Sequence, residues 1–286
     1  SPSSAASDVY KRQIFLHASY SLTRKIAFKP YWDLMKIFQL PNIWQYIIDA
    51  SMLIFPERCA ICRRRLRKGE KFLCIKCYAT LPFTHIKGKP ANKVERMFWG
   101  KIPIVRASAF LKYLPQSESS RIFHLLKYGN RPEIGKFFGQ VIANELIGTD
   151  FFNGIDYLIP LPLAVDRLKK RGYNQSEAIA SGIQTVTHIP INTQAIRRHI
   201  SNPSQTHLSL AERKENVKNI FRINSTHELE GKHILLIDDI MTTGSTLLSC
   251  AKELSKIPGI NISIITLGLA GAHYTISRNP PTPRHQ

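Results

Sequence analysis

The segment His233-Ile-Leu-Leu-Ile-Asp-Asp-Ile-Met-Thr-Thr-Gly-Ser-Thr246 carries the clearest structural signal in the chain. Its four consecutive apolar residues, Ile234 to Ile237, predict a strand that is buried on both faces of a parallel sheet. Asp238 and Asp239 follow where such a strand meets the carboxyl edge of the sheet, the usual ligand edge of open α/β folds. We therefore expect an α/β protein whose parallel sheet is flanked by helices and carries a polar site at this edge.

A phosphate-binding loop is predicted directly after the two aspartates, where a helical stretch from Leu247 to Leu254 begins. Small residues let backbone N–H groups close around a phosphate, and a helix N-terminus favours the negative charge. With the two carboxylates as acceptors for sugar hydroxyls, the loop predicts a ribose-5-phosphate site. The alternative is an ordinary strand–turn–helix in which the aspartates and threonines only cap the helix. The loop residues are Thr242, Thr243, Gly244, Ser245 and Thr246.

This combination resembles the signature of type I phosphoribosyltransferases, which bind 5-phosphoribosyl-1-pyrophosphate (PRPP) together with Mg²⁺. The resemblance implies that Asp238 and Asp239 form the catalytic acid pair and hold the ribose 2′- and 3′-hydroxyls. It also implies that the loop from Thr242 to Thr246 cradles the 5′-phosphate of PRPP.

Further elements of such a domain follow from hydrophobic spacing. An edge strand is expected over Ile102–Leu111, and helices are expected over Ser119–Tyr128 and Pro132–Leu146. Tyr157–Leu163 is a short apolar segment interrupted by prolines, and it predicts another strand. These elements supply the sheet and the helices that the acid pair and the phosphate loop require.

A basic turn follows that strand, between Asp166 and Gln175, and leads into a further helix. In a PRPP enzyme, this position holds the pyrophosphate, and Gly172 would permit the tight turn. The alternative is a basic turn that is merely solvated. The expected cations are Arg167, Lys169, Lys170 and Arg171.

A mobile loop that closes over the pyrophosphate is expected between Ile196 and Phe221. The segment begins polar and ends as a charged helix, Ser209–Lys218, with Ser209 as N-cap and Glu212 completing a capping box. The alternative is a structural connector. The loop residues expected at the site are Gln205, Thr206, Arg213 and Asn216.

Four of the five cysteines form two Cys-x-x-Cys pairs that are separated by eleven residues. This spacing predicts a tetrahedral thiolate site for structural Zn²⁺, with no open coordination position for a reacting water. Disulfides are disfavoured because the sequence shows no secretory signal, while an iron–sulfur cluster uses the same ligand type. The expected metal ligands are Cys59, Cys62, Cys74 and Cys77.

Positive charge is concentrated in this part of the chain. The 286-residue protein has a net charge of +20, and the segment from Arg58 to Lys101 holds thirteen basic but only two acidic residues. The Arg63–Lys68 excursion between the cysteine pairs would meet polyanions such as single-stranded DNA, with Phe72 and Tyr78 available to stack on bases. Alternatively, the charge only keeps the surface soluble, and the two aromatic residues form the core of the module.

The expected domain organisation has four parts. Residues 1–29 would form a disordered tail, 30–101 amphipathic helices and the four-cysteine zinc module, 102–275 the phosphoribosyltransferase-like domain, and 276–286 a second tail. The most apolar stretch, Ile43–Phe55, is about thirteen residues long, whereas a membrane helix needs about 20. We therefore expect a soluble, cytoplasmic protein with no transmembrane segment.

Several motifs in one order resemble the ComF family (competence protein F, with GntX-type relatives), which joins a four-cysteine zinc module to a type I phosphoribosyltransferase domain. One departure is Asn202, which stands where threonine is expected in the mobile loop. The matching segments are Pro56-Glu-Arg-Cys-Ala-Ile-Cys62, Leu73-Cys-Ile-Lys-Cys77, Leu81-Pro82, Leu126-Lys-Tyr-Gly129, Arg171-Gly-Tyr-Asn-Gln175, Ser204-Gln-Thr-His-Leu-Ser209, Arg213, Asn216 and Asp238 to Thr246.

The resemblance implies a role in natural transformation, with PRPP, single-stranded DNA and proteins of the DNA-uptake machinery as partners. Three functions stay open: a PRPP- and Mg²⁺-binding protein that also binds DNA, a conventional phosphoribosyltransferase of nucleotide salvage or biosynthesis, and a DNA-binding adaptor that PRPP regulates. The concentrated charge favours the first or the third. A transferase would displace pyrophosphate from ribose C1 through an oxocarbenium-like state, and its acceptor is not assigned.

Overall fold

The computed structural model of the protein describes residues 57–198, 220–224 and 226–271. Several sequence expectations fall outside these residues: the tails 1–29 and 276–286, and the amphipathic helices within 30–55. The mobile-loop helix Ser209–Lys218 and the loop residues Gln205, Thr206, Arg213 and Asn216 also lie outside them.

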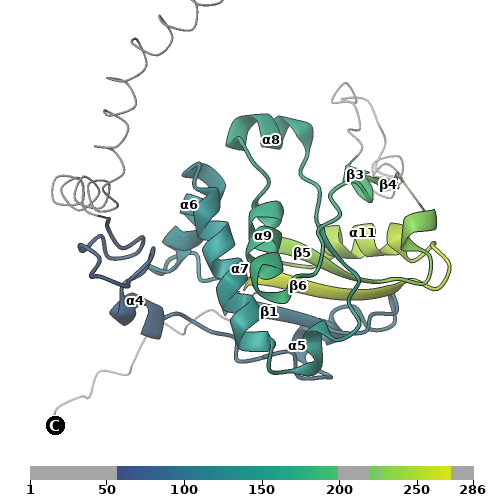
Figure 1. Ribbon diagram of the computed structural model, residues 1–286, viewed down its shortest axis with the longest axis horizontal. Helices are drawn as coiled ribbons and strands as arrows, with labels where there is room; N and C mark the ends of the chain where they lie inside the picture. The colour runs from purple at the N-terminus through teal and green to yellow at the C-terminus, as the bar shows by residue number, and fades with distance from the viewer. Residues whose placement is uncertain (1–56, 199–219, 225, 272–286) are drawn as a thin grey trace, which may run out of the picture. The chain divides into compact units, whose positions relative to one another are not determined.

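Four parallel strands form the central sheet (Figure 1). Their order is β1-β6-β5-β2. β5 pairs with β6 from His233 to Met241 and with β2 from Ile234 to Ile237. This arrangement confirms the predicted parallel α/β fold and the edge position of the first strand. The strands are β1 (Ala107–Lys112), β2 (Tyr157–Pro160), β5 (His233–Met241) and β6 (Asn261–Leu269).

Strand β5 is buried on both faces because its apolar run alternates between two hydrophobic clusters. Leu235 and Ile237 belong to the cluster formed with α6 (Ser120–Tyr128), α7 (Pro132–Leu146) and α9 (Gln175–Thr187). Figure 1 shows α7 and α9 side by side against the sheet. The predicted bounds of α6 differ from the observed ones by one residue, and those of α7 agree with them.

The opposite face of the sheet packs against a second set of elements. Ile234 and Leu236 of β5 lie in a cluster with residues of α5 (Lys93–Arg96) and α11 (Ser245–Leu254). A small antiparallel pair, β3 (Ile196–Arg198) and β4 (Phe221–Ile223), also contributes to this cluster. Two short 3₁₀ helices span Asp150–Phe152 and His227–Leu229.

The cysteine-bearing segment shares its core with the sheet. Cys59, Leu73 and Cys77 lie in the same hydrophobic cluster as residues of α7. The short helix α4 (Ile75–Ala79) carries Cys77. The Phe72 ring lies 5.4 Å from that of Phe137 in α7, and Tyr78 packs 5.9 Å from Phe83. The structure therefore favours the alternative in which Phe72 and Tyr78 form part of a core over the one in which they stack on bases.

Three differences from the sequence expectations concern element bounds. The first strand begins at Ala107 rather than Ile102, and the second ends at Pro160 rather than Leu163. The predicted basic turn is a short helix, α8 (Val165–Arg171), which Gly172 ends in the left-handed conformation with φ 78°. Among the described residues, no helix combines the length and apolarity that a membrane crossing requires.

Candidate functional site

Asp238 and Asp239 lie at the carboxyl end of β5, next to the start of α9. The Asp238 Oδ1 accepts hydrogen bonds from the Ser176 hydroxyl, at 3.3 Å, and from the Asp239 backbone N–H, at 2.8 Å. The Asp239 Oδ2 lies 3.5 Å from the Lys127 ammonium, and its Oδ1 accepts the Ile240 N–H at 2.6 Å. All of these donors lie outside α11, so the acid pair does not serve as the cap of that helix.

The predicted phosphate loop connects β5 to the N-terminus of α11. Gly244 is the N-cap with φ 73°, a conformation that other residues adopt only under strain. Gly244 itself offers no side-chain acceptor to the first turn of α11, but the neighbouring Thr243 hydroxyl oxygen accepts the Ser245 backbone N–H at 3.4 Å. Thr242, Thr243 and Ser245 are exposed, and the Thr243 hydroxyl lies 3.1 Å from that of Ser245. The loop therefore presents exposed hydroxyl groups at the start of α11.

The two carboxylates influence each other electrostatically. Burial and the neighbouring charge of Asp239 raise the pKa of Asp238 to about 7, and the Ser176 hydrogen bond and the Lys127 charge only partly oppose this. A carboxyl that gains its charge near neutral pH is well suited to a site where a cation or sugar hydroxyls compensate that charge.

The basic residues predicted to hold pyrophosphate lie on α8 and are mostly exposed. Arg167, Lys169 and Lys170 have solvent-exposed side chains, and no residue of α8 is buried. Arg171 is only partly exposed: its guanidinium donates to Gln175 Oε1 at 2.8 Å and lies 5.7 Å from the ring centroid of Tyr128. The structure thus brings the acid pair and the phosphate loop together, and it presents α8 to solvent.

Three residues of the site region were missed by sequence reasoning. Ser176 and Lys127 contact the acid pair, from α9 and α6 respectively. Arg198, at the end of β3, is half-buried; burial lowers its pKa, the charge of Arg167 acts in the same direction, and Asp238 opposes them. Lys127 lies within the Leu126–Gly129 motif, but no local pattern distinguished its role.

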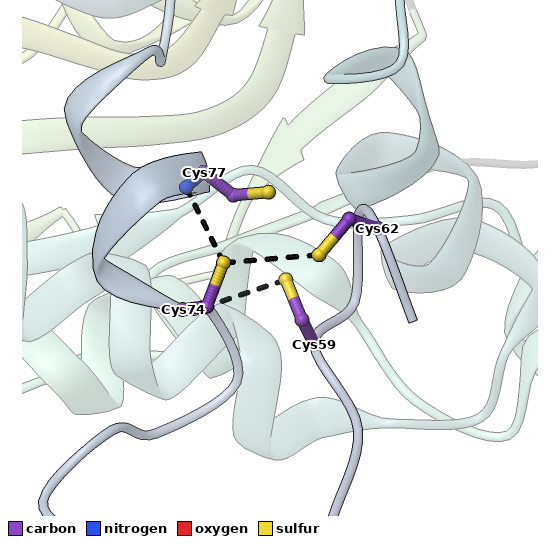
Figure 2. A group of neighbouring side chains, drawn as sticks. All are labelled: Cys59, Cys62, Cys74 and Cys77. Atoms are coloured by element: carbon purple, nitrogen blue, oxygen red, sulfur yellow. Dashed lines mark hydrogen bonds between the residues drawn. The ribbon is translucent and has the colours of Figure 1, made fainter. Parts of the chain in front are cut away.

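The four cysteines form a second candidate site. Their sulfur atoms all lie within 4.8 Å of one another, and Figure 2 shows them converging from two chain segments. The Cys62 and Cys74 sulfurs are 3.7 Å apart. Tetrahedral coordination with metal–sulfur bonds of about 2.3 Å requires a separation of about 3.8 Å. The donor set and its spacing therefore fit a tetrahedral metal ion, whereas a disulfide requires about 2.05 Å.

Two charged residues, Arg64 and Glu70, are hydrogen-bonded next to the cysteine cluster. Burial acts to raise the pKa of Cys74, but hydrogen bonds from the Cys77 N–H and from Arg64 outweigh it and lower the pKa to about 6. Glu70 accepts the Arg64 guanidinium at 2.8 Å and the backbone N–H groups of Arg67 and Ile75 at 2.7 and 2.9 Å. Arg64 is thus committed to the cysteine cluster rather than to the exposed surface.

Known proteins resemble the chain along most of its length. The phosphoribosyl transferase domain matches residues 137–275. Competence protein F of Haemophilus influenzae is 35% identical over 222 residues, which cover 72% of this chain and 94% of that protein. The chain belongs to the ComF family.

Other relatives extend this result. DNA utilization protein YhgH of Escherichia coli K12 is 30% identical over 201 residues, 69% of this chain and 84% of that protein. The ComF family thus includes relatives whose names refer to competence and to DNA utilization. Among solved structures, a B. subtilis glutamine PRPP amidotransferase complexed with ADP and GMP covers 48% of this chain and 26% of its own, at 18% identity and a TM-score of 0.32. A likeness this distant says nothing about the ligands of this chain.

Proposed function

We propose that this protein binds PRPP and Mg²⁺ at the carboxyl end of β5 and acts in DNA uptake, where it also binds single-stranded DNA. One observation carries the first half of the proposal: two adjacent carboxylates, Asp238 and Asp239, precede a loop of small, hydroxyl-bearing residues that enters α11 through Gly244. This arrangement offers acceptors for two ribose hydroxyls beside donors for the 5′-phosphate.

Each side chain has a separate task in this proposal. Asp238 and Asp239 accept the ribose hydroxyls, while Ser176 and Lys127 orient them through the contacts described above. The hydroxyls of Thr242, Thr243, Ser245 and Thr246 and the first N–H groups of α11 donate to the 5′-phosphate. Arg167, Lys169, Lys170 and Arg171 supply positive charge for the pyrophosphate.

Mg²⁺ fits this donor set because it prefers oxygen ligands, and a carboxylate pair next to bound phosphates is its usual environment. Asp238 and Asp239 are the residues that would hold it, directly or through the ribose hydroxyls. When bound, the ion supplies charge that stabilises the departing pyrophosphate.

Transferase chemistry is part of the proposal as a further step. The C1–O bond to pyrophosphate breaks as a nucleophilic acceptor forms a bond to C1, and pyrophosphate leaves with the bonding electron pair. The cations of α8 stabilise the charge that develops on the leaving group. The acceptor stays unassigned.

The role in DNA uptake is supported by the family and by the charge. A relative named competence protein F matches 72% of the chain, and the names of other relatives refer to DNA utilization. Thirteen basic residues lie between Arg58 and Lys101 against Glu70 and Glu95. Glu70 is turned toward Arg64 and the backbone, so it does little to neutralise the exposed arginines.

We also propose that the four cysteines hold Zn²⁺ in a structural role. Four thiolates leave no open position for a reacting water, and the spacing of the sulfurs suits the ion. The segment around them buries few large side chains of its own, so metal binding would contribute much of its stability.

A titration with PRPP in the presence and absence of Mg²⁺ tests the proposal. We expect saturable binding that requires Mg²⁺, followed by pyrophosphate release when an acceptor is found in a screen of nucleobases and single-stranded oligonucleotides. PRPP binding with release only in the presence of a free nucleobase, and no DNA binding, would instead favour a conventional enzyme of salvage or biosynthesis. Absence of PRPP binding would contradict the proposal.

A further inference from the structure

An exposed tryptophan lies outside both sites described so far. The Trp99 side chain is 54% exposed, whereas the neighbouring Phe98 is 1% exposed. Among the phenylalanine, tyrosine and tryptophan side chains of the described residues 58–101, Trp99 alone is exposed, because Phe72, Tyr78 and Phe83 pack into the core. A large aromatic side chain left half in solvent forgoes hydrophobic stabilisation, and such residues are frequent at binding surfaces.

A tight turn holds Trp99 in this position. The backbone N–H groups of Lys101 and Ile102 both donate to the Phe98 carbonyl, at 3.0 and 3.2 Å. Phe98 anchors the turn in the cluster beneath α11, so that Trp99 stands at its outer corner. A preorganised aromatic platform loses little conformational entropy when a ligand binds to it.

The charge around Trp99 is positive. The Arg96 guanidinium carbon lies 5.8 Å from the centroid of the Trp99 ring, and both Arg96 and Lys101 are exposed. The Lys101 ammonium donates to the Met97 carbonyl at 2.7 Å, which fixes the stem of that side chain in the same turn. This surface therefore combines a π-face with two cations.

The acidic residue of this region is turned away from the surface. Glu95 is the one acidic residue in the sequence between residues 71 and 117. It is 5% exposed, and its carboxylate accepts the backbone N–H of Ala107 in β1 at 3.3 Å. The segment that carries Trp99 thus presents no exposed carboxylate of its own that would repel a polyanion.

The turn lies next to the phosphate loop. A Cβ placed on Gly244 would lie 3.6 Å from Phe98 Cζ and 3.7 Å from Met97 Cε. Phe98 and Met97 thus lie against the loop at Gly244, and the exposed Trp99 follows Phe98 directly in the chain. A polyanion bound at Trp99 would therefore lie close to Gly244 and the proposed PRPP site.

We propose that the surface formed by Arg96, Trp99 and Lys101 binds single-stranded nucleic acid, with one base stacked on Trp99 and the two cations contacting phosphates. A single strand fits better than a duplex because only unpaired bases expose a face for stacking. The inference rests on the proposed binding of single-stranded DNA, and it adds a second contact surface to the Arg63–Lys68 excursion.

The test measures binding of a fluorescent 15-nucleotide oligo(dT) to the full chain by anisotropy, for the wild type and matched variants. Trp99→Ala should raise the Kd by at least about fivefold, because stacking contributes about 1–3 kcal/mol per base. Trp99→Phe should retain most of the affinity. Ile147→Ala is the control, because Ile147 is 55% exposed at the end of α7 and belongs to neither proposed site. A PRPP titration of each variant checks that the fold is intact.

A second variant tests the cations and remains informative if Trp99→Ala fails to fold. Arg96→Ala with Lys101→Ala should reduce the slope of log affinity against log salt by about 1.4, since each phosphate contact contributes about 0.7. Wild-type affinity in Trp99→Ala, or an unchanged slope in the double variant, would overturn the inference and leave the proposed DNA binding to the arginine excursion. Absence of oligo(dT) binding by the wild type at low salt would overturn both, whereas PRPP binding would still stand.

Discussion

The Ser176 hydroxyl donates to Asp238 Oδ1 at 3.3 Å and joins the start of α9 to the carboxyl end of β5. Ser176 is 3% exposed, and the side chain of Asn174, the N-cap of α9, accepts its backbone N–H at 3.0 Å. The position of the serine is therefore set by the helix start. It acts on the acid pair as a positioning residue.

Replacement of Ser176 by alanine should weaken PRPP binding by about twofold to tenfold, because one hydrogen bond contributes about 0.5–1.5 kcal/mol. It should also raise the pKa of Asp238 further, since the hydroxyl stabilises the charged form. Calorimetric titration with PRPP and Mg²⁺ over a range of pH measures both effects. Ser181→Ala, on the same helix, is the control, and equal behaviour of the two variants would contradict a positioning role.

The affinity for PRPP should rise with pH between about pH 6 and about pH 8. Asp238 must be ionised to accept ribose hydroxyls, and burial beside Asp239 raises its pKa to about 7. The free energy of unfolding should change in the opposite direction to the PRPP affinity. Because the pKa of Asp238 is higher in the folded protein than its unfolded value of about 3.9, this carboxyl contributes stability at low pH. That contribution is lost as the pH rises through about 7. Asp238→Asn serves as the reference, because its profile reports only the ionisation of PRPP. A wild-type profile identical to that of the variant would refute this assignment.

Purified protein should contain about one zinc per chain, measured by elemental analysis. Cys59→Ser or Cys77→Ser should abolish stoichiometric zinc and lower the thermal stability, since Cys59 and Cys77 are buried in the core shared with α7. PRPP binding should persist because the acid pair lies on β5 and is held by Ser176 and Lys127 rather than by the cysteine cluster. Iron with visible absorbance, in place of zinc, would overturn the metal assignment.

The arginine excursion should contribute to DNA binding through Arg63, Arg67 and Lys68, which are all exposed. Arg64 is left intact, because it bonds to Glu70 and its removal would disturb the cysteine cluster. The triple alanine variant should reduce the salt slope of single-stranded DNA binding by about 0.7 for each phosphate that these side chains neutralise in the wild type. An unchanged slope with intact affinity would leave this excursion without a role in nucleic-acid binding.

Much of the fold follows from local sequence patterns. The apolar run before Asp238 predicted β5, and the spacing of apolar residues predicted α6 and α7 almost to the residue. The helical form of residues 165–171 was missed, because every residue of α8 is at least partly exposed and no apolar stripe marks the helix. The segment was expected as a turn for that reason.

The candidate site was only partly predictable. Asp238, Asp239 and the phosphate loop are adjacent in the chain, so their pattern could be recognised directly. Ser176 lies 62 residues from Asp238, and Lys127 contacts Asp239 from another helix, so both contacts depend on how the sheet is assembled. Exposure could not be predicted from sequence either: Phe72 and Tyr78 pack inward, whereas Trp99 faces solvent.

The central claim is that Asp238 and Asp239 form the ribose site of a PRPP-binding protein. Calorimetry with PRPP and Mg²⁺ on the wild type and on Asp238→Asn with Asp239→Asn tests it most directly. We predict at least a tenfold loss of affinity with an unchanged fold, because hydrogen bonds to charged groups contribute about 1.5–3 kcal/mol and about 1.4 kcal/mol gives a factor of ten. Asp150→Asn, which removes an exposed carboxylate from a 3₁₀ helix, should bind like the wild type. Wild-type affinity in the double variant would contradict the claim.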